Sequence, residues 1–164
     1  MADGVIFRAL HTTVAGGAVF VDASGIADFA GCVFDDCRAA NGCGPPFNAA
    51  GGGGALALAG GGSGVLSRCV LRNSWSGCAG GAVDMRNNNS ATPFAANLTI
   101  TLSSFHNNSA HEAIGHDIHI YRDGDNKGAV PCPSPGLNCD SSPNTTRCCF
   151  DGDLVGLNVT LPAA

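Results

Sequence analysis

The stretch GGAVFVD, residues 16–22, recurs in related form further along the chain. GGALALA begins at residue 53, GGAVDMR at residue 80, and a degenerate copy, GHDIHIY, at residue 115. Two adjacent glycines permit a tight corner with positive φ or a close approach of two backbone segments. A repeat of this period is typical of architectures that stack one short unit on the next.

A second signal lies between the glycine corners. It is centred on a large apolar residue in CVFDDCRA, CVLRNSW, SFHNNSA and, less clearly, VIFRALHT, and those residues are Phe34, Val70, Phe105 and Phe7. Asn73 and Asn108 follow three residues after two of these centres, and we expect them to bond backbone groups at corners. Two independent signals in the same order indicate a true repeat.

Apolar residues alternate with period two after each glycine corner, as in half-buried strands. We expect one parity to point inward: Val19, Val21, Leu56, Leu58, Val83, Met85, Ile118 and Ile120. We expect the other to face outward: Phe20, Ala57, Asp84 and His119. A further apolar parity consists of Leu98, Ile100 and Leu102, leading to Phe105.

No helical period is long enough to cover a sheet, so strands of successive repeats are expected to pair with each other. The sequence therefore predicts an all-β fold, a right-handed parallel β-helix of about three to four coils with a Cys-rich C-terminal extension. A β-sandwich is the alternative, but it would not require like residues at like positions of each repeat. The predicted repeat domain spans residues 1–121, residues 122–164 form a disulfide-rich loop or cap, and loops are expected at 41–52 and 86–97.

The chain is apolar and weakly charged: 45% of its residues are hydrophobic, 13% are charged, and the net charge is −5. With no basic run, it lacks the electrostatic footprint of nucleic-acid binding. No uninterrupted apolar stretch is long enough for a membrane-spanning helix.

Nine cysteines are many for 164 residues, and the C-terminal ones lie among Pro, Ser, Asn and Gly, where disulfides are plausible staples. The candidates are Cys32, Cys37, Cys43, Cys69, Cys78, Cys132, Cys139, Cys148 and Cys149. Their connectivity is open, and the odd number leaves one thiol free or paired elsewhere. The absence of C-x-x-C argues against a zinc site.

Five N-x-S/T sequons accompany these cysteines, at Asn88, Asn97, Asn107, Asn144 and Asn158. Together they favour a secreted or cell-surface glycoprotein, although the first residues do not read as a signal peptide.

The paired signals, GGA followed by an apolar residue and F-x-x-N, resemble the polymorphic outer membrane protein repeat of chlamydial and other extracellular proteins. The best matches are GGAV at 16, GGAL at 53, GGAV at 80 and FHNN at 105, and the resemblance covers roughly residues 5–121. It implies a β-helical fold and a surface or adhesion role.

The histidine-rich stretch 105–121 invites a metal-site interpretation. The zinc-protease pattern H-E-x-x-H fails, because His111 and His116 are five residues apart. A looser set of His116, Asp117 and His119 remains an alternative to a solvated turn and strand. DGDNKG at 123–128 is better read as a turn than a calcium loop, because Lys127 replaces an oxygen ligand. No metal or cofactor is therefore predicted.

One outward patch is the candidate ligand site: Asp84, Arg86, Asp117, His119 and Tyr121. Paired carboxylates with Arg, His and Tyr suit sugar binding or acid–base cleavage of a polysaccharide, as in a pectate-lyase-like enzyme. The competing interpretation is an exposed sheet laced with Asp–Arg pairs. The leading prediction is a non-enzymatic, structural or adhesive extracellular repeat protein. Its expected partners are surface proteins or glycans, and end-to-end self-association is included.

Overall fold

The computed structural model describes residues 1–22, 25–40, 52–87, 97–111, 117–122, 136–142, 145–151 and 154–162. Every regular element in these ranges is a β-strand, so the predicted all-β class is confirmed. Within the same ranges no helix exists that could cross a membrane. The two predicted loops, 41–52 and 86–97, lie almost wholly outside the described residues.

Fifteen strands form four successive repeats. Repeat one contains β1 (Ala2–Asp3), β2 (Ile6–Arg8), β3 (His11–Thr12) and β4 (Val19–Val21). Repeat two contains β5 (Ile26–Ala30), β6 (Val33–Asp35), β7 (Arg38–Ala39) and β8 (Leu56–Ala59). Repeat three contains β9 (Ser63–Ser67), β10 (Val70–Arg72), β11 (Trp75–Ser76) and β12 (Val83–Asn87). Repeat four contains β13 (Asn97–His106), β14 (Ser109–Ala110) and β15 (Ile118–Arg122).

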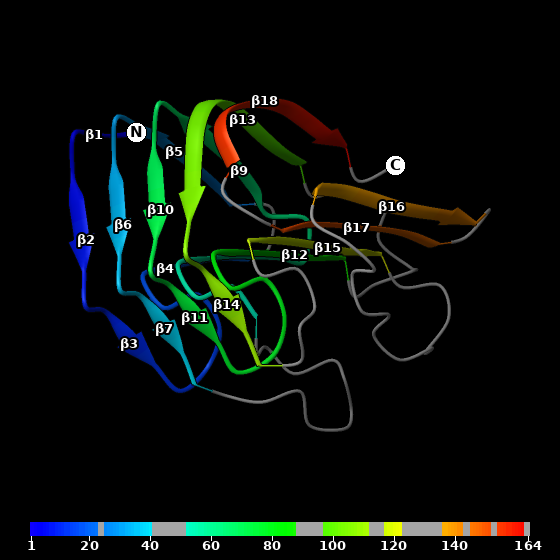
Figure 1. Cartoon of the computed structure of the whole chain (residues 1–164), viewed down its shortest axis with the longest axis horizontal. Coiled ribbons are helices and arrows are strands. Elements are labelled where there is room, and N and C mark those ends of the chain that lie inside the picture. Colours follow the sequence, from blue (N-terminus) through cyan, green and yellow to red (C-terminus); the bar gives the residue numbers. More distant parts are fainter. Residues whose placement is uncertain are drawn as a thin grey trace.

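Corresponding strands of successive repeats pair in parallel and form three sheets (Figure 1). The order β14-β11-β7-β3 makes the first of these, and β15-β12-β8-β4 runs through the second. The third has the order β1-β5-β9-β13-β10-β6-β2, because the long β13 pairs with β9 through one half and with β10 through the other. This sheet therefore folds back on itself at β13.

The glycine corners set the register of the sheet that contains β4, β8, β12 and β15. Val19 lies opposite Leu56, Leu56 opposite Val83, and Val83 opposite Ile118, as the repeat predicts. The first glycine of each intact pair has positive φ, namely +65° at Gly16, +72° at Gly53 and +63° at Gly80.

The second glycine of each pair serves close approach between repeats. A Cβ built on Gly17 would lie 2.0 Å from the carbonyl oxygen of Gly54, and one on Gly54 would lie 2.0 Å from that of Gly81. Non-bonded contacts that short do not occur in proteins, so a side chain at either position would clash with the backbone of the next repeat. Both expected reasons for the glycine pair therefore hold, one for each glycine.

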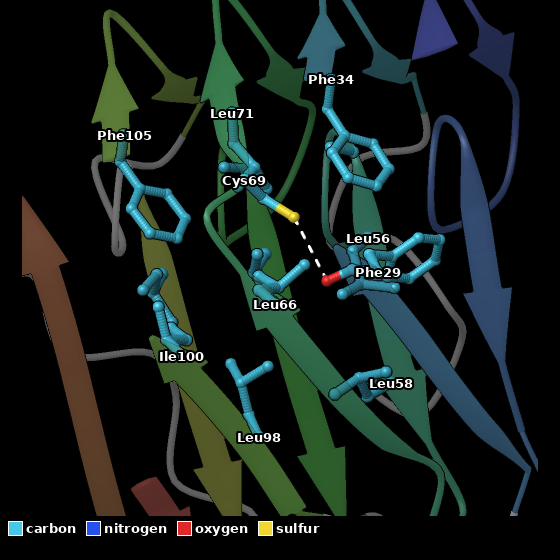
Figure 2. Packing of buried hydrophobic residues seen from close by; sticks show 14 of the residues in the cluster. Phe29, Phe34, Leu56, Leu58, Leu66, Cys69, Leu71, Leu98, Ile100 and Phe105 are labelled. Atoms are coloured by element: carbon cyan, nitrogen blue, oxygen red, sulfur yellow. Dashed lines mark hydrogen bonds between the residues drawn. The ribbon is translucent and has the colours of Figure 1, made fainter. Parts of the chain in front are cut away.

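Buried apolar side chains fill the space between the sheets (Figure 2). The inward parity is confirmed where side chains are described beyond repeat one, with Leu56, Leu58, Val83, Met85 and Ile118 all almost fully buried. Phe34 and Phe105 are also buried, as the second signal predicts. The centre that the sequence predicts at Val70 is wrong by one residue. Leu71 is the residue that aligns with Phe34 and Phe105 in the neighbouring strands.

The expectation that Leu102 continues the apolar parity of Leu98 and Ile100 does not hold in the structure. Leu98 and Ile100 are buried, but Leu102 is 57% exposed and has a φ of +50°. The chain turns a corner there, which interrupts the alternation and restarts it so that Phe105 points inward. Gly4, Gly31 and Arg68 have positive φ at the equivalent corners.

Small polar side chains satisfy the backbone just inside this corner. The Cys69 thiol lies 3.4 Å from the carbonyl oxygen of Phe29 in the preceding repeat (Figure 2). In the same way, Cys32 reaches the carbonyl oxygen of Ala2 at 3.4 Å, and the Ser103 hydroxyl reaches that of Leu66 at 3.2 Å. The Ser103 oxygen also accepts from the Cys69 amide at 3.0 Å. We call Cys32, Cys69 and Ser103 the inner ladder.

A second set of inward polar groups follows the next corner. The Cys37 thiol lies 3.7 Å from the Phe7 carbonyl oxygen, and the Asn108 amide nitrogen donates to the Leu71 carbonyl at 3.0 Å. The Asn108 side-chain oxygen accepts from the Ser74 amide at 3.0 Å. The expected role of Asn108 is thus confirmed. Asn73 is exposed and occupies the corner itself with a φ of +55°.

The structure corrects the disulfide prediction for three cysteines. Cys32, Cys37 and Cys69 are free thiols, fully enclosed and hydrogen-bonded to backbone carbonyls. They pack as small hydrophobic side chains whose S–H groups donate weak hydrogen bonds, and they do not cross-link the chain. Cys78 is disulfide-bonded, and its partner is not one of these three. Side chains of the remaining cysteines lie outside the described part of the chain.

We expect the three enclosed thiols to resist alkylation in the folded protein. Burial raises the pKa of Cys37 and of Cys69, which keeps the reactive thiolate scarce as well as inaccessible. Iodoacetamide should label Cys32, Cys37 and Cys69 only after denaturation, without any reductant, as read by peptide mass mapping. Cys78 should need reduction as well. Labelling of all four only after reduction would contradict the assignment of free thiols.

The C-terminal segment supplies three further strands, β16 (Gly136–Ser142), β17 (Thr145–Asp151) and β18 (Leu154–Pro162). β17 pairs antiparallel with β15, and β16 pairs antiparallel with β17. β18 pairs antiparallel with β13 and follows its curve in Figure 1. Two of the three sheets are therefore covered at the repeat-four end, while β1, β2, β3 and β4 are edge strands at the other end.

Candidate functional site

Asp84 and His119 form the centre of the predicted patch. They lie opposite each other on β12 and β15, because the glycine corners bring these strands into register. His119 Nδ1 and Asp84 Oδ1 are 2.7 Å apart, which is a short hydrogen bond. Both belong to the outward parity, yet Asp84 is 3% and His119 is 8% exposed. The expectation that they face solvent is therefore wrong, since strand periodicity shows a side chain's direction but not what covers it.

A glycine backbone lies directly against the Asp84 carboxylate. A Cβ built on Gly52 would be 1.8 Å from Asp84 Oδ2. Any side chain at position 52 would thus displace the carboxylate from its place beside His119. In the sequence, Gly52 is only one of four consecutive glycines, so nothing there distinguishes it.

The described hydrogen bond of Asp117 is to Asn108 and not to Asp84 or His119. Its Oδ1 accepts from the Asn108 side-chain amide at 2.8 Å, and the residue is 2% exposed. Asp117 occupies the place that Ala82 has in the preceding repeat, where its carbonyl accepts from the amides of Ala82 and Val83. The expectation that the Asp117 side chain faces solvent is wrong, because it is buried and accepts a hydrogen bond from Asn108.

Arg86 and Tyr121 are placed only by their backbone. They lie opposite each other two positions beyond Asp84 and His119, with the pair of Met85 and Ile120 in between. The structure thus brings Asp84 and His119 together, aligns Arg86 with Tyr121, and directs Asp117 to Asn108.

The other predicted sites are only partly described. His111, Asn97 and Asn107 are exposed, and Asn158 belongs to β18. The positions outside the described residues are Glu112, His116, Asn88, Asn144 and the segment 123–128. Among the described side chains, no group of three or more His, Cys, Asp or Glu is arranged to hold a metal ion.

A charged cluster that the sequence interpretation missed surrounds Asp35. Its carboxylate accepts from Arg72 at 3.0 Å and from the Asn73 side chain at 2.9 Å, and Arg8 lies 3.3 Å away. These contacts, with the Arg72 hydrogen bond foremost, hold the pKa of Asp35 below its ordinary value. The signal was available, because Arg8, Asp35 and Arg72 each follow an aligned residue of the second signal.

Asn107 continues this cluster along the outer corner. Its side-chain amide donates to the Asn73 side-chain oxygen at 2.9 Å, and both residues have positive φ. Asparagine tolerates that conformation better than most residues. The cluster therefore links all four repeats across one corner by polar contacts.

Comparisons with protein families, with curated proteins and with solved structures return no match for this chain.

Proposed function

We propose that the chain is a right-handed parallel β-helix that acts as an extracellular structural or adhesive module. The parallel pairing of like strands from four repeats supports the helix, because it stacks one repeat on the next. Right-handed crossovers are the overwhelming rule between parallel strands of one sheet, which supports the handedness. The resemblance to the polymorphic outer membrane protein repeat points to the same architecture and to a surface role.

One observation carries the non-enzymatic assignment. The acidic and histidine side chains that were candidates for chemistry are buried and hydrogen-bonded within the protein. The hydrogen bond between Asp84 and His119 joins repeat three to repeat four. The hydrogen bond between Asp117 and Asn108 lies within repeat four. Groups used in this way stabilise the stack of repeats, and a stack that presents only its outer faces is suited to scaffolding or adhesion.

Two features support an extracellular location. Cys78 is disulfide-bonded, and disulfides persist chiefly in oxidising compartments. The sequon residues Asn97 and Asn107 are exposed, so a glycan on either would project from the surface.

A carbohydrate-binding or carbohydrate-cleaving function is the second candidate. The 2.7 Å hydrogen bond between His119 and Asp84 is the observation that favours it, because a carboxylate that orients an imidazole is a recurrent element of acid–base sites. Arg86 and Tyr121 lie opposite each other two positions further along the same strands, and they would supply groups that bind an acidic sugar.

Asp84→Asn separates the two functions. The amide oxygen still accepts a hydrogen bond from His119, but the negative charge is lost. We expect the wild type and Asp84→Asn to behave alike on a panel of glycans and uronate polysaccharides, with no turnover by either. Asp36→Asn, a change in an exposed aspartate that pairs with Arg38, is the matched control. Wild-type binding or cleavage that Asp84→Asn abolishes and Asp36→Asn retains would establish the second function instead.

A further inference from the structure

The repeat-one end of the stack is open, because no further strand pairs with its outer edges in the described chain. β1, β2, β3 and β4 each end a sheet, so repeat one presents the edges of four strands. Edge strands are normally protected by very short length, charged side chains, proline, bulges or a covering segment. These four strands are two or three residues long and carry the charged residues Asp3 and Arg8, but they contain neither lysine nor proline and no segment of the described chain covers them.

Exposed apolar side chains concentrate at the same end. Among the residues whose side-chain exposure is described, eight large hydrophobic residues are exposed, and six of them belong to residues 1–22: Met1, Val5, Ile6, Leu10, Val14 and Phe20. Ile6 is 61% exposed. An unpaired edge with an apolar surface around it is a site for pairing with another β-strand.

The backbone of β2 shows which groups are offered. The Val5 carbonyl accepts from β6 at 2.9 Å, and the Ala9 amide donates to β6 at 3.0 Å. Successive residues of a strand direct their backbone groups to opposite neighbours. Phe7 therefore faces β6 as well, while the N–H and C=O groups of Ile6 and Arg8 point to the open edge.

The Phe7 side chain is the last aromatic ring in a row of stacked rings inside the protein. Its ring stacks on that of Phe34 with centroids 4.7 Å apart and planes 8° apart, and Phe29 meets it edge-on. Phe7 is only half-buried, whereas Phe34 is fully buried. The row of rings thus ends at repeat one with one face of Phe7 still to be covered.

We propose that this chain forms a two-fold symmetric dimer in which the β2 edges of two copies pair antiparallel about Phe7. In this register, Ile6 of each copy lies opposite Arg8 of the other. Those are the residues whose backbone groups face the edge, so each pair exchanges two hydrogen bonds. The two Phe7 rings meet on the symmetry axis and continue the row of stacked rings.

At the opposite end two of the three sheets are covered, which selects a second copy in this orientation. Head-to-tail stacking would need the outer edges of β13 and β15, and β18 and β17 already occupy them. These two strands also demonstrate that the repeat edges accept antiparallel partners. An isologous contact closes on itself. Assembly therefore stops at the dimer.

Two substitutions at one exposed position test the dimer and its register. Ile6→Lys places a cation opposite Arg8 of the other copy, and Ile6→Glu places an anion there. We expect sedimentation velocity over a micromolar concentration series to show a wild-type dimer. Ile6→Lys should raise its dissociation constant about tenfold or more, and Ile6→Glu should leave it unchanged or lower it. Leu102→Lys is the matched control, since Leu102 is similarly exposed (57%) but lies in repeat four.

Each alternative occupant of the edge gives a different outcome. A wild-type chain that is monomeric throughout the series overturns the proposal and leaves the edge to further repeats of a longer chain or to another protein. Assemblies that grow beyond the dimer also overturn it, and equal effects of Ile6→Lys and Ile6→Glu overturn the register. Far-UV circular dichroism and thermal unfolding of each variant confirm that the comparison is between folded proteins.

Discussion

Gly54→Ala is expected to prevent the repeats from stacking and to cost at least about 3 kcal/mol of folding stability. The new methyl group would lie 2.0 Å from the Gly81 carbonyl oxygen and 2.7 Å from the backbone nitrogen of Trp75. All of these atoms are backbone, so no side-chain rotation relieves the contact. The expected readout is a large loss of thermal stability, or failure to recover folded protein on expression.

Gly31→Ala is the control that separates close approach from backbone conformation. Gly31 has a φ of +60°, but a Cβ there would meet nothing nearer than 3.7 Å. Only the left-handed conformation is penalised, at roughly 1–2 kcal/mol. If Gly54→Ala lost no more stability than Gly31→Ala, the close contact between repeats would not be the reason for the second glycine of each pair.

His119→Leu is expected to destabilise the protein by about 3 kcal/mol, because it removes the imidazole from a buried carboxylate. Asp84 is 3% exposed and lies 2.7 Å from His119 Nδ1, so it would lose a close hydrogen-bond partner where water has little access. Chemical denaturation with the linear extrapolation method measures the change.

The single variant Asp84→Ala and the double variant Asp84→Ala with His119→Leu complete a double-mutant cycle that measures the coupling between the two residues. Ala57 occupies the equivalent place in repeat two, so the sheet accepts an apolar residue there. The double variant should be more stable than His119→Leu alone, since no charge is left in the buried position. Additive losses would mean that the two side chains act independently.

The repeat register could be predicted from the sequence because glycine pairs have a stringent physical cause. Val19, Leu56, Val83 and Ile118 align as expected, and the positive φ values of Gly16, Gly53 and Gly80 explain why. Corners formed by ordinary residues leave no such mark. The alternating pattern therefore groups Leu102 with Leu98 and Ile100, because the pattern does not reveal a single residue with φ near +50°.

The candidate site was predicted in composition but not in environment. Register placed Asp84 opposite His119 correctly, because parallel pairing follows from the repeat. Their burial depends on backbone that reaches them from elsewhere, such as Gly52, and no local pattern encodes it. Likewise, β16 to β18 lie in a segment whose Pro, Ser, Asn and Cys content suggested loops, and their pairing with earlier strands overrides that local preference.

The inner ladder makes the contact between one repeat and the next the same at each step. Each donor of Cys32, Cys69 and Ser103 is matched to an acceptor of the repeat before it, so the pattern is the same at every step. Ile26 lies opposite Ser63, so a tandem copy of residues 26–62 would enter the stack in phase and leave no polar group unmatched at this ladder. Gene duplication within the chain can therefore change the molecule's length while its cross-section stays the same.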